Sequence, residues 1–155
     1  MSPRTAVTMP ATDPVALPPP TAFAVTYART TRPGAPLSEE DARRPGEARR
    51  QIAAWLPGRG LAPLVDDARQ ILSELVTNAF AHGSGPVAVR GLVLDSGALE
   101  LRVYSDGLVG ELCPRRARED AQNGRGLWLV TALTDAWGVA ADGRYVWCRL
   151  GGDAP

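Results

Sequence analysis

The residue pair with the clearest chemical potential is Glu74 and Asn78, which lie four positions apart in a segment of helical periodicity. Residues four apart on a helix share one stripe of its surface, and the angular positions place this stripe at the edge of an apolar arc. There a side chain is half covered but can face a cleft. An amide oxygen can ligate Mg²⁺, and a carboxylate can orient or deprotonate a water or a hydroxyl. The alternative interpretation is a solvated helix edge, although a chain with only two Asn and seven Glu residues would rarely form this pair by chance.

Two glycine-containing turns follow further along the chain. Asp106-Gly107 comes directly after a predicted strand, where an aspartate can accept a hydrogen bond from an exocyclic amine and a glycine lets a flat ring approach the backbone. The second turn is Gly124-Arg125-Gly126-Leu127. It opens a predicted apolar helix, and glycines at a helix N-terminus expose backbone N–H groups to phosphate oxygens. Taken singly, each turn is more typical of an ordinary loop than of a ligand site.

The composition excludes several kinds of chemistry. All seventeen basic residues are Arg, so mechanisms that need a lysine are excluded: the phosphate-loop NTPase, the Schiff-base enzyme and the usual protein kinase. A phosphate site would therefore depend on backbone donors, Mg²⁺ and Arg. Seventeen acidic residues balance the basic ones, which argues against nucleic acid or an anionic membrane as a direct partner. With Cys113 and Cys148 far apart and only one His, neither a disulfide scaffold nor a zinc site is expected.

The length of 155 residues indicates one domain with a tail. Residues 1–20 contain six prolines and few large apolar groups, so we expect a disordered tail, with the domain at residues 21–152. No apolar stretch approaches the roughly 20 residues that a membrane span needs, and the N-terminus does not resemble a secretory signal. We therefore expect a cytoplasmic protein.

Periodicity predicts the elements that must position these residues. A strand is expected at residues 23–28 and a helix after Ser38, with Pro45 in its first turn. The second helix runs from Pro63 to Gly83. The remaining elements are strands at 87–94 and 99–105, a loop at 111–123, a buried helix at 126–134 and a hairpin at 137–150. In the strand at 99–105, Leu99, Leu101 and Val103 should face inward, and Glu100 and Arg102 outward. The predicted fold is an α/β two-layer sandwich with a mixed, mostly antiparallel sheet and helices on one face.

In their order along the chain, the motifs resemble a known superfamily. ELVTNAFAHG on a helix, a strand leading into SDG, and GRGLWLV opening another helix are similar to the ATPases of gyrase, heat-shock chaperones, histidine kinases and mismatch-repair proteins. ELVTNAFAHG and NGRGLWLVTALTDAWG look most like the stand-alone bacterial anti-sigma-factor serine/threonine kinases. The similarity covers about residues 21–150 and implies the Bergerat-type ATP-binding fold.

The resemblance implies a role for each matching residue. Asn78 would bind Mg²⁺, and Glu74 would be the general base. Asp106 would read the adenine amine, with Gly107 and Gly110 beside it. The glycine-rich turn would close around the phosphates of ATP through Gly124, Arg125, Gly126 and Leu127. Residues 111–123 would form a lid over the nucleotide.

The implied activity is transfer of the γ-phosphate of ATP to a serine or threonine of an anti-sigma-factor antagonist, with the kinase acting as a homodimer. The alternative is a nucleotide-dependent regulator that binds a sigma factor or another transcription regulator without transferring phosphate. Two departures from the family pattern keep this alternative open. Leu108 and Val109 stand before Gly110, where relatives have an earlier glycine, and Ala81 replaces a basic residue that many relatives carry three positions after the Mg²⁺-binding Asn. A detached histidine-kinase domain is less favoured, because the sole His, His82, is expected to be a helix-terminal residue. A structural domain that has lost nucleotide binding is the remaining possibility.

Overall fold

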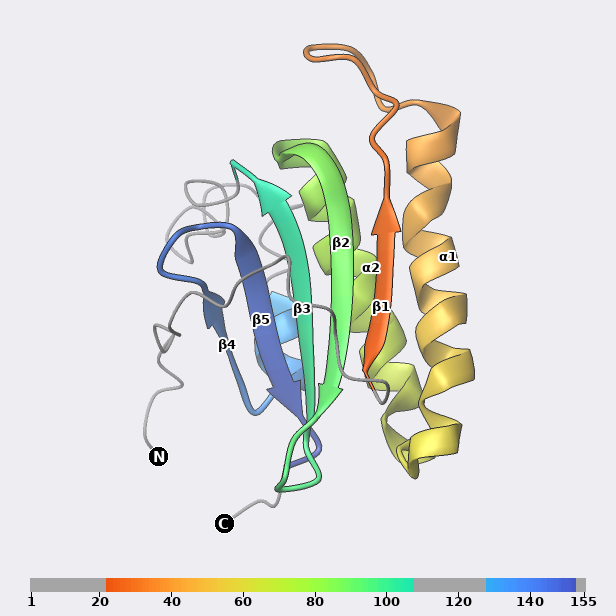
Figure 1. The fold of residues 1–155 in the computed structure, drawn as a ribbon, viewed down its shortest axis with the longest axis vertical. Helices are drawn as coiled ribbons and strands as arrows, with labels where there is room; N and C mark the ends of the chain where they lie inside the picture. Colours follow the sequence, from red (N-terminus) through yellow and green to blue (C-terminus); the bar gives the residue numbers. More distant parts are fainter. Residues whose placement is uncertain (1–21, 108–127, 153–155) are drawn as a thin grey trace.

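The computed structural model describes residues 22–107 and 128–152, which form a five-stranded antiparallel sheet with helices on one face (Figure 1). The strand order is β1-β2-β3-β5-β4. The strands are β1 (Phe23–Tyr27), β2 (Ser84–Val93), β3 (Leu99–Asp106), β4 (Ala136–Val139) and β5 (Tyr145–Leu150). The helices are α1 (Glu39–Trp55) and α2 (Val65–His82), and residues 128–133 are also helical. This arrangement confirms the predicted two-layer α/β sandwich, with every strand pairing antiparallel.

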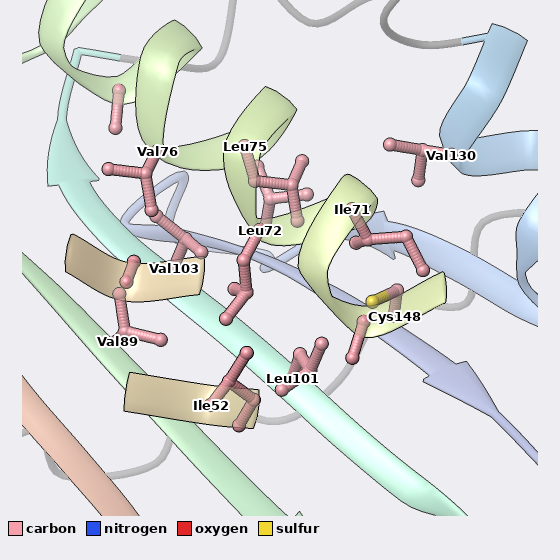
Figure 2. Close-up of a cluster of buried hydrophobic side chains, with 14 of the residues drawn as sticks. Ile52, Ile71, Leu72, Leu75, Val76, Val89, Leu101, Val103, Val130 and Cys148 are labelled. Carbon is pink, nitrogen blue, oxygen red and sulfur yellow. The ribbon is translucent and has the colours of Figure 1, made fainter. Parts of the chain in front are cut away.

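The core lies between the sheet and α2. Every second residue of β3 and β5 is apolar and faces the helices. These residues pack against a buried apolar stripe that runs along α2. Figure 2 shows Leu72, Leu75 and Val76 of α2 over Leu101 and Val103 of β3. Burial of this stripe fixes the rotation of α2 about its axis, and therefore fixes which α2 residues lie at the margin of the core.

Helix α1 begins where a side chain can cap it. The Ser38 hydroxyl accepts a hydrogen bond from the Asp41 amide at 3.1 Å, and three acidic residues occupy the first turn. Pro45 consequently lies inside the helix, and its predicted place in the first turn is wrong. The Ser38 cap decides the start of the helix, and α1 continues through Pro45 although an interior proline loses its N–H hydrogen bond and crowds the carbonyl of the fourth residue before it.

Helix α2 has both predicted boundary residues. Pro63 lies in a short 3₁₀ turn, Ala62–Leu64, directly before the helix, and Gly83 is the residue at which it ends. The backbone of Gly83 is extended, so a left-handed conformation is not the reason for glycine here. A Cβ atom at this position would collide with the Ser105 hydroxyl and lie 2.7 Å from the Ala79 carbonyl oxygen. Glycine is required because the end of α2 packs directly against β3.

Two other predictions need correction. Glu100 does face away from the helices, but it is only 1% exposed, because Arg102 and Arg149 bind its carboxylate at 2.7 and 2.9 Å. The helix expected at 126–134 was predicted to be buried, and its described residues, 128–133, bury Val130 while Trp128 is 70% exposed. An apolar sequence is covered only on the side that meets the sheet.

The predicted tail at 1–20 and loop at 111–123 lie outside the described residues. Cys148 is a free thiol in the core, and burial raises its pKa to about 12. Neither α1 nor α2 is apolar enough over sufficient length to cross a membrane.

Candidate functional site

Helix α2 presents Glu74 and Asn78 on one stripe, one turn apart. Both residues flank the apolar stripe of α2 that packs on the sheet, in agreement with the position at the edge of the apolar arc that the sequence predicts. Glu74 is half-buried, as predicted. Asn78 lies deeper, with 7% of its surface exposed.

A groove of about 400 Å³ runs along the outer side of α2 and has Glu74 in its wall. Its lining is mainly polar and comes from α1, α2 and the helical residues after 127: Arg49, Asp66, Arg69, Gln70, Ser73, Glu74 and Leu129. Arg49 donates a hydrogen bond to the Ser73 hydroxyl at 2.9 Å, which holds the guanidinium of α1 across the groove. The groove therefore combines two cations, Arg49 and Arg69, with two carboxylates, Asp66 and the half-buried Glu74.

Asn78 keeps a side chain available for a ligand. Among the described residues its amide has no hydrogen-bond partner, and the fully buried side-chain polar atoms without partners belong to Arg44, Tyr145 and Trp147 instead. The Asn78 amide thus retains contact with solvent despite its low exposure. An uncommitted amide oxygen at the edge of a core is a suitable single ligand for a hard cation.

The described residues contain no cluster of three His, Cys, Asp or Glu side chains that could hold a metal ion. Mg²⁺ is normally bound through one or two protein oxygens, with substrate phosphates and water completing the octahedron. The residues present therefore fit a magnesium ion that arrives with a polyphosphate, for which Asn78 would supply the protein oxygen.

Asp106 and Gly107 lie where β3 ends, beside the C-terminus of α2. Asp106 is the exposed last residue of β3 and pairs with Ser84, while Gly107 has a φ of +80°, a conformation that favours glycine. The Asp106 carbonyl oxygen lies 3.0 Å from the position that a Gly83 Cβ would occupy. The end of the helix that carries Asn78 therefore contacts the end of the strand that carries Asp106.

The remaining predicted site residues fall outside the described part of the chain: Gly110, Gly124, Arg125, Gly126, Leu127 and the lid at 111–123. The structure thus brings two of the three predicted segments together. His82 is the last residue of α2, as expected of a helix-terminal histidine.

Sequence reasoning missed Arg29, which follows β1 and caps the C-terminus of α2. Its guanidinium donates to the carbonyl oxygens of Phe80 at 2.7 Å, Ala79 at 2.8 Å and Gly85 at 2.9 Å, and it also lies over the Phe80 ring. Phe80 lies in the last turn of α2, whose carbonyls lack an intrahelical partner, while Ala79 already accepts from the Gly83 amide and gains a second donor in Arg29. A cation at this end also complements the helix dipole. Arg29 fixes the end of α2 just beyond Asn78. No local sequence signal marks it, because its partners lie 50 or more positions away.

A second carboxylate, Asp41, shows the opposite environment from Glu74. It is fully buried at the junction of β1 and α1. Burial alone would raise its pKa, but the amides and hydroxyls of Thr31 and Thr30 donate hydrogen bonds to it and lower the pKa to about 2. Asp41 is therefore a structural anion whose acceptor sites are satisfied within the protein.

Comparison with known families gives one match. The family model described as the histidine kinase-like ATPase domain matches residues 38–150, which include α1, α2, and all strands but β1. A search among curated proteins found no match to this chain. The matched range is well over half of the 155 residues and contains the Glu74–Asn78 stripe and Asp106.

Proposed function

The chain belongs to the histidine kinase-like ATPase domain family, and from that premise we propose that it binds ATP with Mg²⁺ and transfers the γ-phosphate to a partner protein. The proposed acceptor is a serine or threonine of an anti-sigma-factor antagonist. The observation that carries this proposal is the placement of Glu74 in a groove wall, one helical turn from the uncommitted amide of Asn78.

The proposed nucleotide site follows α2. Asp106, exposed at the end of β3, would accept a hydrogen bond from the adenine amine, and Gly107 leaves room for the ring. Asn78 would hold the magnesium ion, which neutralises charge on the phosphates when it is bound. The glycine turn at residues 124–127 would supply backbone N–H donors to the same phosphates. This arrangement needs no lysine.

Glu74 would act on the acceptor. Its carboxylate accepts the proton of the partner hydroxyl as the hydroxyl oxygen forms a bond to the γ-phosphorus. The bond between that phosphorus and the β–γ bridging oxygen breaks, and ADP leaves. The groove supports this role, because it extends from Glu74 towards the N-terminus of α2, away from Asn78, and so leaves space for an acceptor segment.

A second candidate function is nucleotide-dependent binding of a sigma factor or another transcription regulator without phosphate transfer. The observation that favours it is Ala81, which is exposed three residues after Asn78 and offers no charge to a phosphate. The nearby Arg29 cannot compensate, since its guanidinium already binds three backbone carbonyls.

Incubation with γ-labelled ATP, Mg²⁺ and candidate antagonist proteins distinguishes the two functions. The kinase proposal predicts label on a partner hydroxyl that is stable in acid, as phosphoserine and phosphothreonine are. ATP-dependent association without label on the partner would support the second function. Absence of ATP binding would contradict both.

A further inference from the structure

The face of the sheet opposite the helices carries an aromatic and charged layer. Side chains alternate across a strand, so this face receives the residues of β3 and β5 that do not enter the core. We call them the outer-face layer: Glu100, Arg102, Tyr104, Tyr145, Trp147 and Arg149. Tyr145 and Trp147 are each only 1% exposed, although α1, α2 and the helical residues 128–133 lie on the other face (Figure 1).

Ion pairs and ring contacts order this layer. Glu100 binds both neighbouring guanidinium groups, and these stack on the rings: Arg149 lies 5.2 Å from the Trp147 centroid, and Arg102 lies 5.2 Å from that of Tyr145. On β4, a Cβ at Gly138 would lie 3.0 Å from the Trp147 ring. The glycine therefore lets the indole lie closely against the neighbouring strand.

Two hydrogen-bond donors in the layer have no acceptor within residues 22–107 and 128–152. The Trp147 indole nitrogen and the Tyr145 hydroxyl are fully buried, and neither has a hydrogen-bond partner among the described residues. A buried donor without a partner costs about 1–3 kcal/mol, so such groups usually meet an acceptor. Aromatic surfaces that carry indole N–H and phenol O–H donors are typical of sites for polyproline segments, whose rings pack on the aromatics while their carbonyls accept hydrogen bonds.

We propose that the outer-face layer is the docking site of the chain's own proline-rich N-terminal segment, with residues 14–20 in polyproline II conformation. This segment contains Pro14, Pro18, Pro19 and Pro20, and it enters β1 at the edge of the sheet. Prolines fix φ in advance, so a segment that cannot fold alone loses little entropy on docking.

The reach of the segment fits this site. Phe23 pairs with Gly91, which pairs with Leu101, which pairs with Cys148, so the start of β1 is level with the residue next to Trp147. The distance from β1 to β5 is three strand spacings, about 14 Å. A polyproline helix advances about 3.1 Å per residue and covers that distance in about five residues. The segment is therefore long enough for Pro18–Pro20 to reach the layer.

Hydrogen exchange of the indole N–H groups, measured by NMR on the full chain and on a variant lacking residues 2–20, tests the proposal. We expect Trp147 Nε1–H to exchange at least tenfold faster in the shortened chain. Trp137 is the internal control, because its indole donates to the Thr131 hydroxyl at 2.9 Å and should exchange at the same rate in both. Equal Trp147 rates in the two chains would overturn the proposal.

Addition of a synthetic peptide of residues 8–22 to the shortened chain provides the second arm. The peptide should restore slow exchange at Trp147, and a peptide with Pro18, Pro19 and Pro20 replaced by Ala should bind at least fivefold more weakly. This comparison changes only the peptide, so it does not depend on the folding of a Trp147 variant. If Trp147 stays protected in the shortened chain, and the protection increases with protein concentration as a dimer forms, a second copy covers the layer and the proposal is wrong.

Discussion

The junction of β1 with α1 and the Glu74–Asn78 stripe of α2 each hold a carboxylate, but the two carboxylates differ in burial and in hydrogen bonding. Asp41 is fully buried, and the hydroxyl and amide of Thr31 donate to it at 2.6 and 2.8 Å. Glu74 is half-buried in a groove wall and has no hydrogen-bond or ion-pair partner among the described residues. The difference separates a carboxylate that stabilises the fold from one that remains free to act on a ligand.

Arg29 and Asn78 show the same contrast between a polar side chain that is hydrogen-bonded within the protein and one that is not. Arg29 binds three backbone carbonyls, and Asp41 accepts from the amides and hydroxyls of Thr30 and Thr31. Both side chains therefore hold β1, α1 and the end of α2 in place. Asn78 lies within reach of the region that Arg29 fixes, yet its own amide is uncommitted. Substitutions should therefore separate into those that lower stability and those that lower activity.

The largest effect is expected for Glu74→Gln. Loss of the base should lower phosphate transfer to the partner by roughly 10²- to 10⁴-fold. The affinity for Mg-ATP should change less than about threefold, and the free energy of unfolding by no more than about 0.5 kcal/mol. Single-turnover transfer of labelled phosphate is the measurement, and Asp95→Asn, at an exposed turn between β2 and β3, is the matched control. A transfer rate within tenfold of the wild type would remove Glu74 from the mechanism.

Asp41→Asn should show the reverse pattern. The amide cannot accept all the hydrogen bonds from Thr30 and Thr31, so the free energy of unfolding at pH 7 should fall by about 2 kcal/mol. ATP affinity per folded molecule should not change. Urea denaturation measures the free energy of unfolding, and calorimetry on the same sample measures ATP affinity. A loss of ATP affinity comparable to the loss of stability would contradict the purely structural role of Asp41.

The stability that Asp41 supplies should depend on pH. Its pKa in the folded state is about 2, below the ordinary value of 3.8, so the contribution is complete above about pH 4 and is lost as the pH falls towards 2. The difference in unfolding free energy between wild type and Asp41→Asn should therefore shrink between pH 4 and pH 2. A difference that stays constant over this range would mean that hydrogen bonding to the charged form is not its source.

A smaller effect is expected for Arg29→Gln, which shortens the cap on α2. Loss of hydrogen bonds to the Phe80 and Ala79 carbonyls should lower the free energy of unfolding by about 1 kcal/mol. ATP affinity should fall a few-fold, because the end of α2 carries Asn78. Arg32→Gln, at an exposed position, is the control and should leave both quantities unchanged.

The smallest effect is expected for Ala81→Arg, which restores a cation three residues after Asn78. An exposed ionic contact is worth about 0.2–1 kcal/mol, so ATP affinity should rise by about two- to fivefold and the gain should shrink at high salt. Ala54→Arg, at an exposed position near the C-terminus of α1, is the matched control. An unchanged affinity for Ala81→Arg would mean that the phosphates do not approach this end of α2.

Local pattern predicted most of the fold. The stripe of α2 and the alternation of β3 follow directly from which residues can be buried, so their positions and the site edge at Glu74 were predictable. The burial of Glu100, the cap by Arg29 and the cradle around Asp41 were not, because each depends on groups from another element. Pro45 does not mark the first turn of α1, because the Ser38 cap sets the start of the helix.

The central claim is tested most directly by calorimetric titration of ATP with and without Mg²⁺ into the wild type and Asn78→Ala, with ADP and GTP as comparisons. We expect the wild type to bind ATP more tightly than GTP and to gain affinity when Mg²⁺ is present. In Asn78→Ala the gain from Mg²⁺ should fall at least tenfold while the fold is retained. An unchanged affinity of Asn78→Ala for Mg-ATP would contradict the assignment of α2 as the metal–nucleotide helix.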